Sequence, residues 1–111
     1  MADANELYDE ADQLKASGDL DGAVAKLTEA VGVQEDYALA YAALAVVEQK
    51  RGNHAEAIAH AQKVCELEPN DPFSFTAMSV TFQRAYAGTG DTSYIQMAED
   101  AMAKSHQLAG R

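Results

Sequence analysis

The chain has 111 residues, of which 48% are hydrophobic, and its 18 acidic and 8 basic side chains give a formal net charge of −10 at pH 7. This length fits one domain with one core, and the negative charge repels phosphate backbones and anionic lipid, so nucleic-acid and membrane partners are not expected. The sequence has no apolar run long enough to cross a bilayer and begins without a basic, apolar leader, so we expect a cytoplasmic protein.

The sequence repeats itself at a step of 34 residues. At this step Gly18 falls on Gly52, Ala23 on Ala57 and Ala30 on Val64. A period of this length is typical of helix–turn–helix units stacked in an array. Because such arrays bury their core between neighbouring units and present a curved surface, we expect a binding protein.

The first unit is predicted to contain a helix over residues 5–16 that ends at Gly18, then a second helix that Asp19 caps and Gly32 ends. The second unit repeats this plan with helices over residues 39–51 and 54–67, separated by Gly52, and Pro69 closes it. Apolar residues recur at three- and four-residue steps in all four helices, which indicates one buried stripe on each.

The third unit departs from the period. A helix is predicted from Phe73 to about residue 87, with Phe75, Ser79 and Phe82 inward and the turn at residues 88–91. If Ala98 is the counterpart of Ala57, the spacing is 41 residues instead of 34, so about seven residues lengthen the first helix and its loop. The last helix is predicted over residues 92–108.

Residues 38–71 resemble a tetratricopeptide repeat over their whole length. Tyr41 matches the family's bulky aromatic, Leu44 and Ala45 its leucine and small residue, Gly52 its turn glycine, and Pro69 its closing proline. Residues 4–37 and 72–108 match less completely. The resemblance implies a single all-α domain over residues 4–108, a right-handed α-solenoid of three repeats of which the third has an elongated first helix and loop.

Small residues are predicted where the two helices of each unit cross. They are Ala11, Ala45 and Ser79 on the first helices and Ala23, Ala57 and Ala98 on the second helices. Small side chains at both positions let two helix backbones approach to about 8 Å.

The resemblance implies that the first helices line a concave surface that binds partner proteins. On the first helices of the second and third units, the face away from the packing stripe is unusually apolar, as is typical of a binding site. The predicted groove residues are Tyr8, Asp9, Asp12, Leu39, Ala42, Ala43, Val46, Gln49, Lys50, Phe73, Thr76, Ala77, Val80, Gln83 and Arg84. The alternative is that alanine is there as a good helix former and that Leu39 and Phe73 are buried between units.

Some family members bind acidic C-termini of chaperones through a clamp of lysine, asparagine and arginine. The corresponding positions here hold Tyr8, Asp12, Ala43, Phe73 and Ala77, so the clamp is absent. Residues 1–37 carry a net charge of −8, from ten acidic and two basic residues. We therefore expect an apolar peptide or helix with a basic portion near Asp9 and Asp12, and not a ligand with an acidic terminus; the alternative is that the acidic end serves solubility.

The last helix predicts a second apolar surface. If Ile95, Ala98, Met102 and Ser105 form its packing stripe, an oligomer edge of exposed residues remains for self-association or partner docking. The alternatives are that the connection over residues 85–91 folds back over this edge or that the edge simply stays exposed. This edge consists of Tyr94, Met97, Ala101 and Leu108.

No catalytic, cofactor or metal-binding pattern is found. Cys65 is the only cysteine, which excludes a CxxC motif and predicts a buried core residue, and His54 and His60 are six residues apart and do not share a helix face. The glycines at 88 and 90 lack the following Lys-Ser/Thr of a phosphate-binding loop. We predict a non-enzymatic adaptor or scaffold; the alternatives are a homo-oligomeric module and a chaperone or targeting subunit for a client protein.

Overall fold

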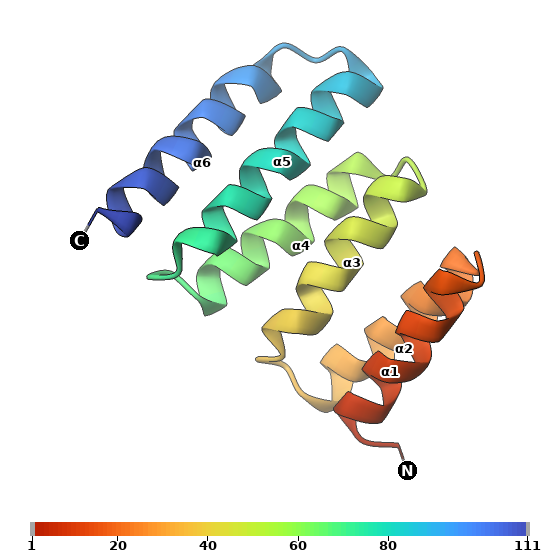
Figure 1. The fold of residues 1–111 in the computed structure, drawn as a ribbon. Coiled ribbons are helices and arrows are strands. Elements are labelled where there is room, and N and C mark those ends of the chain that lie inside the picture. Colours follow the sequence, from red (N-terminus) through yellow and green to blue (C-terminus); the bar gives the residue numbers. More distant parts are fainter. Residues whose placement is uncertain (1, 111) are drawn as a thin grey trace.

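The computed structural model describes residues 2–110, which form six α-helices and no strand. The helices are α1 (Ala4–Ala16), α2 (Leu20–Val33), α3 (Ala38–Lys50), α4 (His54–Leu67), α5 (Pro72–Thr89) and α6 (Ser93–Ala109). Consecutive helices pair into three hairpins, α1–α2, α3–α4 and α5–α6, which stack side by side (Figure 1). This confirms the all-α repeat solenoid, including the elongated first helix of the third hairpin, which has 18 residues where α1 and α3 have 13.

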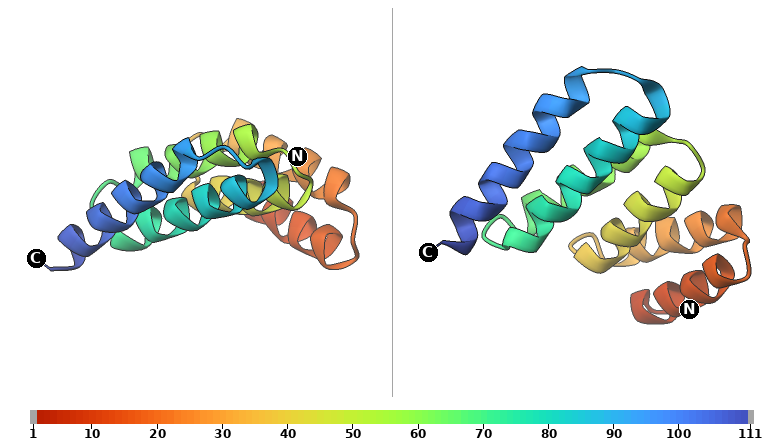
Figure 2. Two further views of the ribbon diagram at one scale, coloured as in Figure 1. Left: turned by 90° about the horizontal axis from the view of Figure 1, so that it is seen from above. Right: turned by 45° about the horizontal axis from the view of Figure 1, so that its top comes forward.

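The three hairpins form a curved array of helices in two layers. In the view from above, α1, α3 and α5 lie along the inner side of the arc, and α2, α4 and α6 lie along the outer side (Figure 2). The described part of the chain measures 41 × 33 × 19 Å, so one dimension is only about two helices thick. In such a thin array no other described segment covers the inner layer of helices, so a partner can reach it.

A glycine in the left-handed conformation turns each hairpin. Gly18 and Gly52 have φ values of 91° and 81°, as the repeat predicts, and Gly90 has a φ of 75°. The expected turn at residues 88–91 therefore begins later than predicted, because α5 continues through Gly88 to Thr89. Similarly, α2 does not end at Gly32 but at Val33, since Gly32 does not adopt a positive φ.

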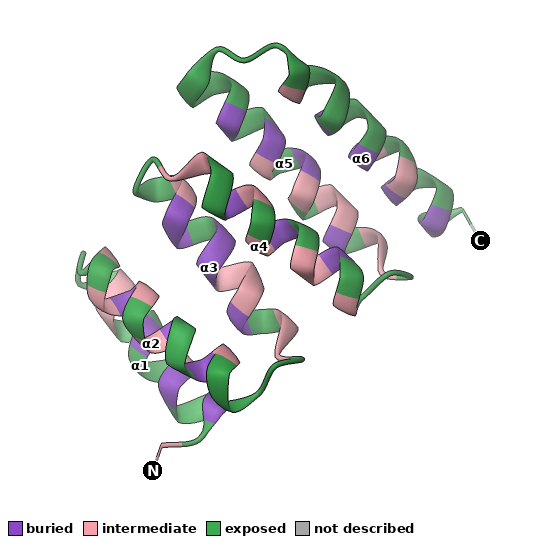
Figure 3. Ribbon diagram, turned by 180° about the vertical axis from the view of Figure 1, so that it is seen from behind, coloured by how far each residue is buried: buried purple, intermediate pink, exposed green. Residues whose placement is uncertain are grey.

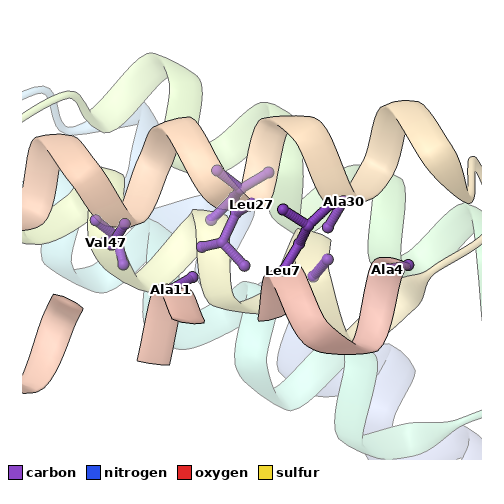
Figure 4. Close-up of a cluster of buried hydrophobic side chains, with 9 residues drawn as sticks. Ala4, Leu7, Ala11, Leu27, Ala30 and Val47 are labelled. Carbon is purple, nitrogen blue, oxygen red and sulfur yellow. The ribbon is translucent and has the colours of Figure 1, made fainter. Parts of the chain in front are cut away.

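The core lies between the two layers and is built from small and branched side chains. Figure 4 shows part of it, where Leu7 and Ala11 of α1 meet Leu27 and Ala30 of α2 and Val47 of α3. The six predicted crossing residues, from Ala11 to Ala98, are all buried. Buried positions follow one stripe on each helix and face the neighbouring helices (Figure 3).

One charged side chain is buried between the first and second hairpins. Glu48 is only 7% exposed; its carboxylate accepts hydrogen bonds from Arg51 Nη1 at 2.6 Å and from Asn53 Nδ2 at 3.3 Å. Arg51 Nη2 also lies 3.0 Å from Asp21 Oδ1 of α2, and the Glu48 hydrogen bond is the main reason that the pKa of Arg51 is raised. The ion network thus links α3 to the preceding hairpin.

Helix α6 is rotated relative to the prediction. Its buried residues are Ala98, Ala101, Ser105 and Leu108, so the predicted oligomer edge is wrong at Ala101 and Leu108. The rotation is set by α5, because Ser79 Oγ donates to the Ala98 carbonyl and Thr76 Oγ1 lies 2.6 Å from Ser105 Oγ. Of the other two edge residues, Tyr94 is half-buried with its ring 6.0 Å from that of Phe82, and Met97 is 45% exposed.

A close contact between His54 and Gly88 joins the second and third hairpins. A Cβ atom at position 88 would overlap Nε2 and Cε1 of the His54 imidazole. The other ring nitrogen, Nδ1, is buried and has no hydrogen-bond partner among the described residues. Only a glycine therefore fits against this imidazole as it stands.

Candidate functional site

A groove opens on the inner side of the arc between α3 and α5, with α4 as its floor. It has a volume of about 350 Å³. We call it the central groove. Its lining residues are Ala42, Ala45, Val46, Gln49 and Lys50 of α3, Ala61 and Val64 of α4, and Ser74, Ala77, Val80, Thr81 and Arg84 of α5.

The middle of the central groove is apolar. Its floor and lower walls carry alanines, which leave space between the helices because their side chains end at Cβ. Val46 of α3 and Val80 of α5 are 44% and 38% exposed. These two valines belong to one contiguous apolar surface with the alanines of the groove, and such exposed apolar patches mark interaction sites.

One end of the groove is basic. Lys50 is the last residue of α3, and Arg84 lies in the C-terminal half of α5. Both side chains are accessible to solvent, and neither takes part in an ion pair within residues 2–110. The other cation in this part of the fold, Arg51, is held by Glu48 and Asp21.

The structure brings seven of the predicted groove residues into the central groove. They are Ala42, Val46, Gln49, Lys50, Ala77, Val80 and Arg84. Thr76 and Gln83 do not line it, and their placement there is corrected. Both lie on the face of α5 that carries Ser79 and packs against α6: Thr76 Oγ1 contacts Ser105 Oγ, and Gln83 Nε2 donates to Ser79 Oγ at 3.2 Å.

The predicted groove residues of α1 lie outside the central groove. Tyr8, Asp12 and Ala43 line a separate and much smaller hollow of about 20 Å³. The Tyr8 ring packs on Tyr37, with centroids 5.8 Å apart. Asp9 is exposed on the same helix.

Leu39 and Phe73 lie at the starts of α3 and α5 and do not line the central groove. They are 60% and 78% exposed, so the alternative that they are buried between units is wrong. They add to the apolar surface of the inner layer.

Five lining residues are absent from the predicted set: Ala45, Ala61, Val64, Ser74 and Thr81. Ala61 and Val64 come from α4, in the outer layer. The sequence identifies them only as packing residues, because the periodicity of one helix does not reveal the gap that the two flanking helices leave above it. Their small size is the one signal that points to an open floor.

A second hollow lies at the free side of the α5–α6 hairpin. Its volume is about 470 Å³, and Ser79, Gln83, Tyr86, Ile95, Ala98, Glu99 and Met102 line it. We call it the end-face hollow. Ile95 is 41% and Tyr86 39% exposed there, so this surface is an open apolar face of the third hairpin.

The side chains that could ligate a metal ion are dispersed over the described part of the chain. No three His, Cys, Asp or Glu side chains within residues 2–110 come close enough together to hold a metal ion. No helix in this range combines the length and the hydropathy that a membrane span requires.

Known proteins share this fold and, in part, this sequence. Residues 38–71 match the family model of the tetratricopeptide repeat. Two solved structures of MamA are similar: one has a TM-score of 0.81 at 22% identity over 96% of this chain and 54% of that chain, and the other 0.81 at 21% identity over 97% and 59%. The chain thus spans a little over half the length of those proteins. No curated protein matches the sequence.

Proposed function

We propose that the chain, whose residues 38–71 match the tetratricopeptide repeat, is a non-enzymatic scaffold that holds an apolar segment of a partner protein in the central groove. Repeats of this family are interaction modules, and stacked helical repeats present extended concave surfaces to their partners. Of this surface, the central groove is the part that offers both a cavity and exposed apolar walls.

The observation that carries the proposal is the exposure of Val46 and Val80 above a floor of alanines. The two valines face one cavity from opposite walls, α3 and α5. Covering apolar surface of this kind yields about 25 cal/mol per Å² removed from water. A partner side chain inserted between the valines removes their apolar surface from water and stabilises the complex by this amount. In the free protein the same surface stays in water and contributes nothing to stability.

The acidic first hairpin supports a second element of the proposal. Asp9 and Asp12 are exposed on α1, within residues 1–37, which carry a net charge of −8. A basic portion of the partner is attracted to this end, which raises the association rate at low salt more than it raises affinity.

The test compares partner capture by three forms of the full chain in an extract of its native host. The forms are the wild type, Val46→Glu combined with Val80→Glu, and Val33→Glu. Val33 is 55% exposed at the end of α2, outside the groove, so it controls for a glutamate added to an exposed valine. We expect proteins identified by mass spectrometry to bind the wild type and Val33→Glu but not the groove variant.

The melting curve of each form is measured alongside. Partner retention by a folded groove variant would contradict the proposal. Unfolding of that variant would show that the valines belong to the core and would contradict it as well.

A homo-oligomeric function is a second candidate, favoured by the end-face hollow. Ile95 and Met102 of α6 line it from one side and Tyr86 of α5 from the other. If copies associate there, Ile95→Glu combined with Met102→Glu should convert an oligomer into a monomer in light scattering. Met97→Glu is the control because Met97 is exposed on α6 outside this hollow. A monomeric wild type at high concentration would eliminate this candidate.

A further inference from the structure

We propose that the central groove binds an amphipathic α-helix of a partner protein, whose acidic side chains pair with Lys50 and Arg84 at one end. The inference rests on the proposed function, because it names the partner of the same groove.

The helical form of the partner is inferred from the hydrogen-bonding capacity of the walls. The backbone groups of α3, α4 and α5 are used within these helices, so the groove offers no free strand edge. Most lining side chains are alanine or valine, and the hydroxyl of Thr81 already donates to the Ala77 carbonyl at 3.0 Å. An extended peptide would bury peptide groups without partners, which is costly, whereas a helix satisfies its own.

The alanine floor fits the surface of a helix. Ala42, Ala61 and Ala77 come from three different helices and end at Cβ, so a fourth helix can approach them closely. Bulky residues spaced three and four apart on the bound helix would then enter between Val46, Val64 and Val80. The partner is therefore expected to carry a narrow apolar stripe of large side chains.

The positive charge at the basic end of the groove favours acidic residues beside the apolar stripe of the partner helix. Lys50 and Arg84 are the two groove cations, and no acidic side chain lines the groove or pairs with them within residues 2–110. A lysine at the end of α3 also complements the helix dipole, but this reason does not apply to Arg84, which lies five residues before the end of α5. In a chain with a net charge of −10, two unpaired cations on one apolar groove complement an acidic ligand.

The missing carboxylate clamp led to the expectation that the ligand has no acidic terminus. The position of Lys50 and Arg84 changes this expectation. The clamp positions on α3 and α5 hold Ala43, Phe73 and Ala77. Lys50 and Arg84 lie seven residues after Ala43 and Ala77, about two helical turns farther along each helix. They are placed to pair with acidic side chains at the end of a bound apolar helix.

The experiment selects ligands from a displayed library of random peptides about five helical turns long, with the full chain as bait. We expect enriched peptides with large apolar residues at three- and four-residue steps and with acidic residues near one end. The best peptide is synthesised and its affinity is measured by isothermal titration calorimetry. Lys50→Glu combined with Arg84→Glu should weaken its binding at least about tenfold, and a peptide with lysines in place of its acids should recover it.

Two controls separate this inference from the proposed function. Lys63→Glu combined with Lys104→Glu makes the same change of net charge at lysines that do not line the central groove, and it should bind the peptide like the wild type. Val46→Glu combined with Val80→Glu should abolish binding. A proline in the middle of the peptide should also abolish it, because it breaks the helix.

Each unfavourable outcome has a distinct meaning. Peptides that need Val46 and Val80 but ignore the charge reversal, or that tolerate the central proline, overturn this inference and leave the proposed function standing. Failure to select any peptide that depends on the two valines contradicts both.

Discussion

The hydroxyl of Ser79 donates a hydrogen bond of 2.7 Å to the backbone carbonyl of Ala98, at the crossing of α5 and α6. Ser79 is 1% exposed. In the first and second hairpins the equivalent position is an alanine, Ala11 or Ala45. The third hairpin thus keeps the small side chain that the crossing requires and adds a buried polar contact between its two helices.

Replacing Ser79 by alanine should lower the free energy of unfolding by about 1 kcal/mol, because a buried hydrogen bond is lost without a change in backbone packing. Urea unfolding followed by circular dichroism measures this. The control is Ser17→Ala, whose hydroxyl also donates to a carbonyl, that of Leu14 at 2.9 Å, but is exposed, so water replaces the bond. Equal losses for both variants would show that burial at the crossing has no effect.

Enlarging a crossing residue should be more costly than removing a hydrogen bond. Ala57 is fully buried where α4 meets α3, whereas Ala59, two residues along α4, is exposed. Ala57→Leu is expected to destabilise the fold by about 1–3 kcal/mol through overpacking, and Ala59→Leu by less than about 0.5 kcal/mol. The same denaturation assay compares them, and similar losses at the two positions would contradict the packing described for this hairpin.

The thiol of Cys65 should be almost unreactive in the folded protein. It is 8% exposed, its Sγ lies 3.4 Å from the Ser74 carbonyl, and burial raises its pKa to about 11. At pH 8 the reactive thiolate is therefore about 100-fold rarer than in an exposed cysteine. A thiol reagent should label the native chain at least that much more slowly than the chain in urea, with Cys65→Ala as the blank. Rapid labelling of the native chain would contradict this burial.

Stability should respond to His60 below neutral pH. Burial lowers the pKa of its imidazole in the folded protein, and the nearby Glu48 and Glu56 oppose this shift only in part. The folded state therefore favours the neutral ring. As the pH falls below about 6.5, the unfolded chain binds the proton first, and the free energy of unfolding decreases until the pH reaches the folded-state pKa.

His60→Gln removes the pH-dependent contribution of this imidazole to the free energy of unfolding. Between pH 7 and pH 5 the wild type should lose more stability than His60→Gln in urea titrations at each pH. His106→Gln, a change at an exposed imidazole of α6, is the matched control. An identical pH dependence of the wild type and His60→Gln would contradict the effect of burial on this ring.

The features that the sequence predicts well are those with strict steric causes. Gly18 and Gly52 are predictable because the hairpin turn needs a positive φ, and Ala23 and Ala57 because two helix backbones meet there. Asp19 is predictable because a helix start leaves free amide groups, and its carboxylate indeed accepts from the Gly22 amide at 2.8 Å. Each of these requirements is local and tolerates few residue types.

Rotations of helices about their own axes are harder to predict. The apolar arc of α6 is wide enough to fit α5 in two orientations, and the hydrogen bonds of Thr76 and Ser79 decide between them. The same problem misplaces Gln83, which is next to Val80 on a helical wheel but faces α6. The rotation of each helix is set by its contacts with another helix, and the periodicity of its own sequence does not reveal these contacts.

The contact between His54 and Gly88 has a consequence for sequence variation. His54 is the first residue of α4 and Gly88 lies in the last turn of α5, so the two positions belong to different helices of adjacent repeats and touch each other in space. A side chain at position 88 would overlap the His54 imidazole unless the imidazole moves. A residue smaller than histidine at position 54 would leave space for a side chain at position 88. Among homologues, substitutions at these positions should therefore occur together: a residue larger than glycine at 88 should accompany a residue smaller than histidine at 54.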